Sequence, residues 1–437
     1  MKRSARPVRI LVIGGGYVGV YSALGLQRRL ARDEAEIVLV NPESFMVYQP
    51  FLPEAASGNI EPRHVVVPLR TVLGRTRLIT GTVVALDHER RVASVAPAEG
   101  PPQEVAYDVV VIGLGSVSRV LPVPGLAERA IGFKTVAEAI YLRNQVLSRM
   151  DAAESTDDAS LRARALTFMF VGAGYAGVEA LAELEDLARD ACRYYRRVRR
   201  EDMRWVLVEA GDRILPEIPS ALAEYALRRL RHRAIEVHLS TRLASAQDDR
   251  MVLSSGEAFE TDTLVWTTGV RANPLVGRLG FALDDRGRLL ADACLRVKGV
   301  EGAWTAGDCA AVPDLSAGGF CPPTAQHALR QARQLVTNVA SVLEGRSPAP
   351  FRYRQLGALV SLGRYKGVAT VLGIRVRGFP AWFLHRTYHL LRVPTLNRKV
   401  RIVLDWTVGL FFRRDVVQLG SLQHPRDPFA AAAGGED

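Results

Sequence analysis

Two stretches of the chain carry glycines at a spacing that is typical of dinucleotide-binding loops. The glycines of this G-x-G-x-x-G pattern are Gly14, Gly16 and Gly19 in the first stretch, and Gly172, Gly174 and Gly177 in the second. The first glycine of such a loop permits a tight strand-to-helix turn, the second lets the backbone approach a pyrophosphate, and the third lets helix and strand pack closely. The helix N-terminus offers free N–H groups and a positive dipole to the phosphates. Two such loops in one chain predict two dinucleotides that meet, most simply a flavin and a nicotinamide that exchange a hydride.

The residue that ends the strand after each loop is expected to contact a ribose. After the second loop, the apolar run 204–208 ends at Glu209, whose carboxylate accepts hydrogen bonds from a ribose 2′-OH and repels a 2′-phosphate. This favours NADH over NADPH, although the nearby Arg213 could weaken the preference. After the first loop the strand ends at Asn41, an amide and a weaker acceptor, and Glu43 could take its place.

A third candidate segment follows a short apolar strand near residue 304. Gly307 permits close approach of a ligand, and Asp308 can accept hydrogen bonds from the ribityl hydroxyls of a flavin. The run 322–332 is predicted to open a helix that extends to about Leu343, and the N-terminus of this helix, with Gln326, could stabilise negative charge on a reduced flavin ring. A turn or helix-capping role for Asp308 and Gln326 is an equally good reading of these residues alone.

Cysteine usage excludes one class of flavoenzyme. The four cysteines are Cys192, Cys294, Cys309 and Cys321. None forms the closely spaced pair that thioredoxin-reductase-like or glutathione-reductase-like chemistry requires. No metal-ligand spacing is evident, so we expect no metal, and no Ser/His/Asp arrangement can be argued.

These residues need a framework of strands and helices that positions them. Each loop joins an apolar strand to an amphipathic helical pattern, which predicts an α/β fold with two Rossmann-like dinucleotide-binding domains and a C-terminal membrane-associating α/β segment. A polar stretch at 151–160 reads as a boundary or exposed loop. The expected domains are 1–150 (FAD-binding, first part), 151–272 (NADH-binding), 273–345 (FAD-binding, second part) and 346–437 (membrane anchoring and dimerisation).

A helical candidate at 184–200 is rich in arginine and contains Tyr194 and Tyr195. A mixture of basic and aromatic residues can bind nucleic acid. A solvated helix end is the better interpretation, because nothing else in the chain resembles a nucleic-acid-binding module. We therefore expect no nucleic-acid partner.

The segment 372–415 is basic and aromatic. The chain has a formal net charge of +11 from 57 Lys and Arg and 46 Asp and Glu. Nine arginines and lysines in this segment stand against Asp405 and Asp415 alone, which gives nine minus two, or +7. Apolar residues at a helical spacing are interleaved with them, a pattern that predicts a helix lying in the surface of an anionic membrane. The alternative is a helix hairpin that packs on the main body or on a second subunit.

With these features the chain resembles the type II NADH dehydrogenases, single-subunit NADH:quinone oxidoreductases that do not pump protons. The resemblance covers nearly the whole chain in order. Its more specific motifs are W-T-x-G-V, a Gly-Val-Glu after the second loop, and A-Q-x-A-x-x-Q. The matching segments are 14–19, 48–58, 133–135, 172–183, 208–216, 266–270, 306–308, 325–331 and 361–364.

The resemblance implies roles for individual residues. The first loop, with Asn41, Gly307, Asp308 and Ala325, would bind non-covalent FAD. The second loop, with Glu209, would bind NADH as substrate. Glu179 would lie by the nicotinamide and flavin, and Gln326 on the side of the flavin that faces the quinone; both are candidate catalytic residues. Two positions depart from the family: Asn41 replaces the usual acid, and Arg330 stands where glutamine is common.

The expected activity is hydride transfer from NADH to FAD, followed by delivery of two electrons to a membrane quinone. No apolar run is long enough to span a bilayer and no signal peptide is apparent, so a peripheral protein on the cytoplasmic face of the membrane, and a homodimer, are expected. One alternative is a soluble NAD(P)H-dependent reductase that serves a small redox protein. Another is a flavin-binding sensor without turnover. A sulfide:quinone reductase is disfavoured because the cysteines are not suitably placed.

Overall fold

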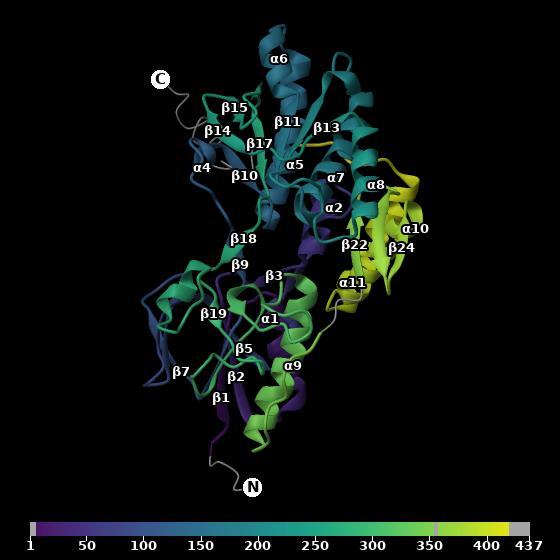
Figure 1. Cartoon of the computed structure of the whole chain (residues 1–437). Coiled ribbons are helices and arrows are strands. Elements are labelled where there is room, and N and C mark those ends of the chain that lie inside the picture. The colour runs from purple at the N-terminus through teal and green to yellow at the C-terminus, as the bar shows by residue number, and fades with distance from the viewer. Residues whose placement is uncertain (1–5, 354–356, 419–437) are drawn as a thin grey trace, which may run out of the picture. The chain divides into compact units, whose positions relative to one another are not determined.

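The computed structural model describes residues 6–353 and 357–418, and these residues form two compact units. Unit 1 contains residues 1–48, 66–119 and 270–355, and unit 2 contains residues 49–65, 120–269 and 356–437. Each unit is built around its own sheet (Figure 1). The last residues of the predicted 346–437 region, 419–437, lie outside the described part.

Unit 1 is organised by a seven-stranded sheet. Its strands, in spatial order, are β20 (Ala303–Thr305), β8 (Val109–Ile112), β1 (Val8–Ile13), β2 (Ala35–Asn41), β5 (Thr76–Asp87), β6 (Val92–Pro97) and β7 (Gln103–Ala106). The strands from β20 to β5 run parallel, whereas β5, β6 and β7 pair antiparallel. The helices α1 (Tyr17–Arg29) and α9 (Ala325–Leu343) pack against each other (Figure 1). Parallel pairing brings the ends of β1, β2, β8 and β20 to one edge, where ligands of such sheets bind.

Unit 2 has a five-stranded parallel sheet. Its order is β10 (Ala130–Gly132), β17 (Thr263–Trp266), β11 (Thr167–Val171), β12 (Arg204–Val208) and β13 (Ile235–His238). A three-stranded sheet of β14 (Leu243–Gln247), β15 (Arg250–Leu253) and β16 (Ala258–Glu260) shares an apolar core with it. The main helices are α5 (Val136–Ser155), α6 (Ala159–Ala165), α7 (Tyr175–Ala191) and α8 (Ser220–Arg231).

The C-terminal segment belongs to unit 2. It consists of a second three-stranded sheet, β22 (Gly357–Ser361), β23 (Gly367–Val371) and β24 (Ile374–Arg377), followed by α10 (Phe379–Arg392) and α11 (Leu396–Phe411). α10 packs on β22 and β23, and α7 also contacts β22. Within the described ranges, the structure contains no helix that combines the length and the hydropathy needed to cross a membrane.

The division into units differs from the predicted domain ranges at several places. Residues 120–150 were predicted to continue the first dinucleotide domain, but they join unit 2 because β10 pairs with β17 and α5 packs on α7. Residues 49–65 also join unit 2, because the short helix α2 (Leu52–Ala56) packs on α5 and α7. Residues 346–355 remain with unit 1.

Two local predictions differ from the structure. The polar stretch 151–160 is not a domain boundary, because α5 extends to Ser155. The alternative, an exposed loop, holds only for the short link 156–158, where Asp158 caps α6 by accepting hydrogen bonds from two backbone N–H groups. The predicted helix at 184–200 ends at Ala191 and is followed by 3-10 turns. Arginines after this point pair with acids of neighbouring segments, as in Arg197–Asp157 at 2.8 Å. This pairing fits the solvated helix end.

Candidate functional site

The first glycine loop lines a pocket at the strand edge of unit 1. The pocket is lined by residues 13–16, 40–42, 81–83 and 113–114, together with Asn273 and Leu275. Gly14, Gly16 and Asn41, all predicted from the sequence, meet here. The loop passes directly from β1 into α1, so the free N–H groups of the helix N-terminus are presented at this pocket.

Two of the three motif glycines in this loop are required by the protein's own packing. Gly14 has φ +100°, and a Cβ there would lie 2.5 Å from the carbonyl oxygen of Gly113. A Cβ on Gly19 would collide with the carbonyl oxygen of Gly14. Gly16 differs: its φ is −83°, and a Cβ would meet nothing within 4 Å. The space beside Gly16 therefore suits a bound group that approaches the backbone, as a dinucleotide pyrophosphate does.

The second loop repeats this geometry in unit 2. Gly172 has φ +105°, and a Cβ there would lie 2.7 Å from the backbone of Thr267. A Cβ on Gly177 would collide with the carbonyl oxygen of Gly172. Gly174 has φ −73° and open space around its Cβ position. Both loops thus hold one glycine that the fold does not need, at the same place in the motif.

Asn41 and Glu209 hold corresponding positions in the two loops. The Oδ1 atom of Asn41 accepts a hydrogen bond from the Gly15 N–H at 2.7 Å, and its Nδ2 donates to the carbonyl of Glu43 at 2.7 Å. The Oε2 atom of Glu209 accepts from the Ala173 N–H at 2.7 Å, and its Oε1 accepts from the Gly211 N–H at 2.7 Å. Each side chain fixes its loop, and the carboxylate keeps lone pairs for further donors.

Asp308 lies in a 3-10 turn, Gly307–Cys309, that follows β20 in unit 1. Its Oδ2 accepts from the Ser116 hydroxyl at 2.6 Å. Gly307 has φ +75°, and its N–H donates to Oε1 of the buried Gln331 at 2.7 Å. The sequence analysis did not predict that Ser116 would bind Asp308 or that Gln331 would accept a hydrogen bond from Gly307. Gln331 is the last residue of the A-Q-x-A-x-x-Q motif. Ser116 and Gln331 together hold the turn in place.

Ala325 and Gln326 begin α9. The helix is capped by Thr324, whose hydroxyl accepts from the His327 N–H. Gln326 Oε1 accepts from the Tyr353 hydroxyl at 2.9 Å, and the guanidinium of Arg330 lies 4.2 Å from the centre of the Tyr353 ring. Tyr353 and His327 line a second pocket of unit 1, next to the loop 314–322. Arg330, a departure from the resembled family, therefore supports the residue that orients Gln326.

Glu179 is buried in unit 2, on the first turns of α7. Its Oε1 accepts from the Ser361 N–H at 2.8 Å and lies 3.2 Å from Nε2 of His385. Glu179 and Gln326 belong to different units. Sequence reasoning missed His385, because a histidine far along the chain leaves no local pattern that points to α7.

The same face of α7 carries further buried acids, each with partners from other elements. Glu183 accepts from Ser57 at 3.1 Å, Asn59 at 2.8 Å and the Ser361 hydroxyl at 3.2 Å. Burial raises the pKa of Glu183, while the charge of Arg414 opposes that rise. These contacts tie α7 to α2 and β22, and so fix the helix that carries Glu179.

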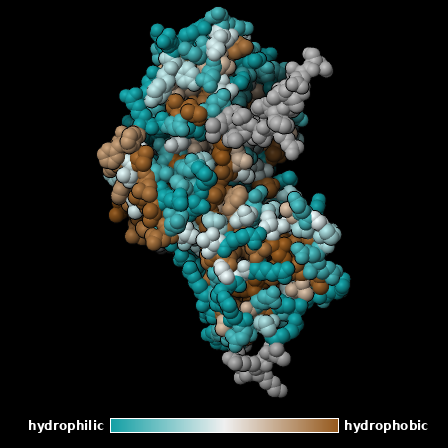
Figure 2. All heavy atoms as spheres, turned by 180° about the vertical axis from the view of Figure 1, so that it is seen from behind, coloured by the Kyte–Doolittle hydropathy of each residue, from teal (hydrophilic) through white to brown (hydrophobic). Residues whose placement is uncertain are grey.

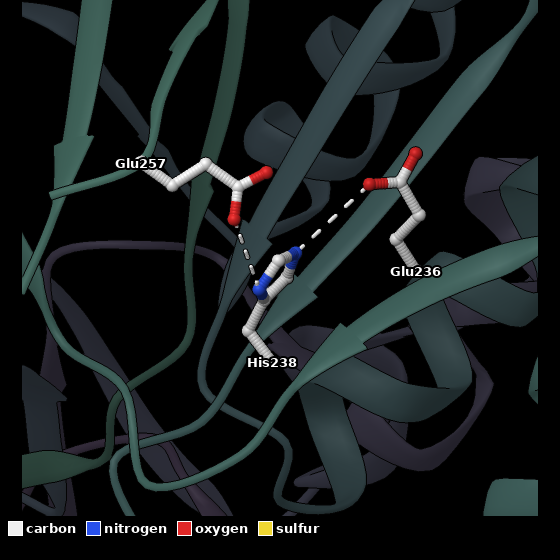
Figure 3. A group of neighbouring side chains, drawn as sticks. All are labelled: Glu236, His238 and Glu257. Atoms are coloured by element: carbon white, nitrogen blue, oxygen red, sulfur yellow. Dashed lines mark ion pairs between the residues drawn. The ribbon is translucent and has the colours of Figure 1, made fainter. Parts of the chain in front are cut away.

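A separate cluster beside β13 in unit 2 contains Glu236, His238 and Glu257, whose side chains point toward one another (Figure 3). His238 lies 3.9 Å from Glu236 and 3.6 Å from Glu257. Arg204 already supplies a cation, since it pairs with Glu236 at 2.7 Å and with Glu257 at 3.7 Å. The same guanidinium lies 4.4 Å from the centre of the Phe259 ring. We interpret the cluster as a structural ion-pair network.

Known proteins resemble this chain along most of its length. A probable NADH dehydrogenase of Dictyostelium discoideum is 29% identical over 93% of this chain and 90% of the relative. A type II NADH:quinone oxidoreductase of Mycobacterium tuberculosis is 28% identical over 93% of this chain and 89% of its own. A demethylphylloquinone reductase of Synechocystis is 30% identical over 92% and 96%. The resemblance to type II NADH dehydrogenases is thereby confirmed.

Among solved structures, NDH2 from Plasmodium falciparum in complex with NADH superimposes with a TM-score of 0.87 at 16% identity, covering 94% of this chain and 100% of that one. This likeness confirms the predicted α/β fold class with its Rossmann-like sheets. A model of the pyridine nucleotide-disulphide oxidoreductase family matches residues 8–332. The four cysteines of this chain are free. The chain belongs to the pyridine nucleotide-disulphide oxidoreductase family.

Proposed function

We propose that this protein is a flavin-dependent NADH:quinone oxidoreductase of type II, with FAD in unit 1 and NADH as the substrate of unit 2. The observation that carries the proposal is the pair of loops, each with one glycine that only a ligand requires, in a chain whose full-length relatives are named NADH:quinone oxidoreductases. Bound FAD would supply the chemistry of accepting a hydride and returning electrons to a quinone. The residues of this chain would bind and orient the reactants and manage protons.

In unit 1, the residues present fit FAD. The open space at Gly16 and the N-terminus of α1 suit the pyrophosphate, and Asn41 lies at the strand end where a ribose is expected. Asp308 accepts from Ser116 and keeps lone pairs for a ribityl hydroxyl. The N-terminus of α9, with Ala325 and Gln326, places a positive helix end in the same unit.

In unit 2, Gly174 and Glu209 would bind the nicotinamide dinucleotide, with Glu209 on the ribose. Replacing Glu209 with glutamine should weaken NADH binding by roughly tenfold to 100-fold, because a charge-assisted hydrogen bond contributes about 1.5–3 kcal/mol. It should also reduce the preference for NADH over NADPH, because the amide no longer repels a 2′-phosphate. Steady-state kinetics with each nucleotide measures both effects. An unchanged preference would remove Glu209 from the ribose site.

The surface of α10 and α11 is apolar, and we propose that it docks on a lipid bilayer. Hydrophobic side chains gather there (Figure 2). The exposed ones on these helices and just after them are Phe379, Phe383, Leu384, Leu391, Leu396, Val400, Val403, Leu404, Val408, Leu410, Phe411 and Phe412. The exposed Arg375, Arg377, Arg401 and Arg413 could reach anionic headgroups.

The opposite face of this helix pair is held on unit 2 by polar contacts. Oε2 of the buried Glu54 accepts from Arg386 at 2.7 Å and from Trp406 Nε1 at 2.8 Å. Asp405 accepts from the Glu61 N–H at 3.1 Å and lies 2.5 Å from Nδ1 of His64. Asp405, the one acid on α10 and α11, therefore faces the protein, which leaves the outer face apolar and basic, as a peripheral attachment to an anionic leaflet requires.

A double variant, Val408→Asp with Phe411→Asp, should lose binding to vesicles that contain anionic lipid. Burying each apolar side chain contributes about 1.5–3 kcal/mol, so each change is expected to cost roughly tenfold or more in affinity. Vesicle co-sedimentation measures this. Val120→Asp is the matched control, since Val120 is also exposed, at 56%, but lies outside the helix pair. Unchanged vesicle binding together with a change from dimer to monomer would assign the surface to a second copy of the chain.

Acceptor specificity tests the proposed activity itself. Purified protein should oxidise NADH when a soluble quinone analogue is present. Oxidation that requires a small redox protein instead of a quinone would favour the soluble reductase, for which the structure offers no specific observation.

A further inference from the structure

Arg414 lies in unit 2 just after the end of α11 and is a buried arginine without a hydrogen-bond acceptor. Its side chain is 4% exposed. Nε, Nη1 and Nη2 are all buried and make no hydrogen bond, and no other arginine among the described residues has all three nitrogens in this state. Burying a charge is costly unless the charge is paired and hydrogen-bonded. The guanidinium of Arg414 is therefore placed to receive an anion.

A second guanidinium, that of Arg143 on α5, lies against the same segment. Its Nη2 donates to the carbonyl oxygen of Asp415 at 2.6 Å, and its Nη1 is buried without a hydrogen-bond partner in the part of the chain that the structure describes. Gly58, at φ +71°, makes room for this side chain, because a Cβ there would collide with Nη1. Burial lowers the pKa of Arg143, the charge of Asp415 opposes that effect, and the charge of Arg414 adds to it. The two guanidiniums are thus close enough to repel each other.

The acids nearest in sequence and space do not supply the missing acceptors. Oδ2 of Asp190 lies 3.5 Å from Nε of Arg414 without forming a hydrogen bond, and its Oδ1 already accepts from Arg193 at 3.1 Å. Oδ1 of Asp415 accepts from the Val417 N–H at 2.9 Å. One shared carboxylate therefore faces a guanidinium that can donate through all three of its nitrogens.

Two further acids act on the arginines through their charge, and both have other partners. Glu183 accepts from two side chains after α2 and from one in β22, and burial raises its pKa, which biases it toward the neutral form. Glu61 pairs with the exposed Arg63 at 2.8 Å. The cations of this site consequently keep an unmet demand for acceptor oxygens.

The site follows directly after the helix pair that we propose to dock on a bilayer. Phe411 ends α11 and Phe412 follows it, and these side chains are 78% and 69% exposed. Residues 413–418 form neither helix nor strand, so this short segment can yield to admit a group from outside. A helix in a membrane surface lies at the boundary between acyl chains and headgroups. Lipid phosphates therefore come within reach of a side chain three residues after its end.

We propose that Arg143 and Arg414 bind the phosphate group of one phospholipid headgroup per chain. A guanidinium is planar and presents a fork of donors that matches two oxygens of a phosphate. Water could accept the same hydrogen bonds but would leave the two positive charges uncompensated. The choice of a lipid as the source of the phosphate rests on the proposed docking of α10 and α11, whereas the demand for an anion does not.

Calorimetric titration with a short-chain phosphatidylglycerol, below the concentration at which it forms micelles, tests the site in the lipid-free, flavin-loaded protein. The parent protein should bind one lipid per chain. Arg414→Gln keeps a polar side chain without the charge and should bind roughly 10- to 100-fold more weakly, because charge-assisted hydrogen bonds are lost. Arg414→Lys should recover part of the affinity, since it restores the charge without the planar fork. Arg242→Gln removes an exposed arginine of unit 2 and should bind like the parent protein.

Thermal unfolding separates a ligand site from a structural ion pair. The short-chain lipid should raise the Tm of the parent protein, because it binds the folded state, and should not raise that of Arg414→Gln. Without lipid, Arg414→Gln should unfold no earlier than the parent protein, because the change removes a buried charge that lacks hydrogen-bond partners. Earlier unfolding of lipid-free Arg414→Gln together with parental lipid affinity would assign Arg414 a structural role and overturn the proposal.

Inorganic phosphate as a second titrant identifies the source of the anion. Tighter binding of the lipid than of phosphate, with both weakened in Arg414→Gln, supports a headgroup site. Equal affinities would overturn the lipid source and leave a site for phosphate from solution. Unchanged binding of both titrants in Arg414→Gln would overturn the site itself. A parent protein that binds the short-chain lipid through Arg414 but does not sediment with vesicles would remove the proposed docking of the helix pair and keep this site.

Discussion

Replacing Arg233 with methionine should lower the free energy of unfolding by about 3–5 kcal/mol. Among the described residues, it removes the one buried cation beside Glu185 and Asp186, which then keep only the partly exposed Arg189 and Arg200 as ion-pair partners. The Arg233 side chain is 5% exposed, and it lies among Glu185 and Asp186, which are 1% and 0% exposed. Its Nε donates to Glu185 at 2.8 Å. Its Nη1 and Nη2 donate to the carbonyls of Leu362 and Ala182 at 2.8 Å and 2.7 Å. The change would therefore break a network that joins α7 to the turn between β22 and β23.

The electrostatics agree with this expectation. Burial lowers the pKa of Arg233, but the charges of Asp186 and Glu185 outweigh burial and raise it. The guanidinium thus stays charged, and it is the buried partner of both acids. Leu362 also follows Ser361 directly, so loss of the contact would disturb the backbone that donates to Glu179.

Urea unfolding followed by tryptophan fluorescence measures the effect. Of the five tryptophans, Trp205, Trp266, Trp382 and Trp406 lie in unit 2, so the signal reports mainly on that unit. Arg228→Met is the matched control: Arg228 lies on α8 and is 65% exposed, 3.9 Å from Glu224. An exposed pair of this kind contributes at most about 1 kcal/mol. Equal midpoints for the two variants would show that the buried network does not depend on Arg233.

Replacing Gly16 or Gly174 with alanine should remove a nucleotide without disturbing the fold. Both glycines have negative φ, and the new Cβ would meet nothing within 4 Å in the protein. In the complex, the methyl group would occupy the space into which the pyrophosphate fits. Overpacking of this kind costs about 1–3 kcal/mol, or roughly tenfold to 100-fold in affinity.

The two variants should differ in what they lose. Gly16→Ala should be purified with a reduced ratio of flavin to protein, whereas Gly174→Ala should keep its flavin and require much more NADH to bleach it. Gly74→Ala, at a position in unit 1 that is likewise open, should leave both properties unchanged. Gly19→Ala and Gly177→Ala should instead destabilise their units, because each Cβ collides with a loop carbonyl. Normal affinities in both Gly16→Ala and Gly174→Ala would contradict the assignment of the loops.

The two loops could be predicted from the sequence because their determinants are local. The turn after β1 and the turn after β11 depend on glycines within one motif, and the strand ends that carry Asn41 and Glu209 follow within the same βαβ unit. A helix opening in the run 322–332 was predicted for the same reason, and α9 begins within that run, at Ala325. A short-range pattern of hydrophobic residues also predicted α11.

The surroundings of Glu179 could not be predicted from the sequence. They depend on contacts between segments far apart in the chain: α7, α2, β22 and α10. His385 and Ser361 approach α7 only through tertiary packing, which leaves no periodic signal. The contacts of Glu54 could not be predicted either, because it accepts hydrogen bonds from Arg386 and Trp406, which lie far along the chain. The ranges of the two units differ from the predicted domains for a related reason, since residues 49–65 leave unit 1 and pack on α5 and α7.

The most direct test of the proposed function is an anaerobic titration of protein purified from membranes. NADH is added until the flavin absorbance is bleached, and a quinone analogue is then added. The proposed function predicts bleaching by NADH and full recovery of the absorbance with one quinone per flavin. Failure of NADH to bleach the flavin, or recovery with a small redox protein but not with the quinone, would contradict it.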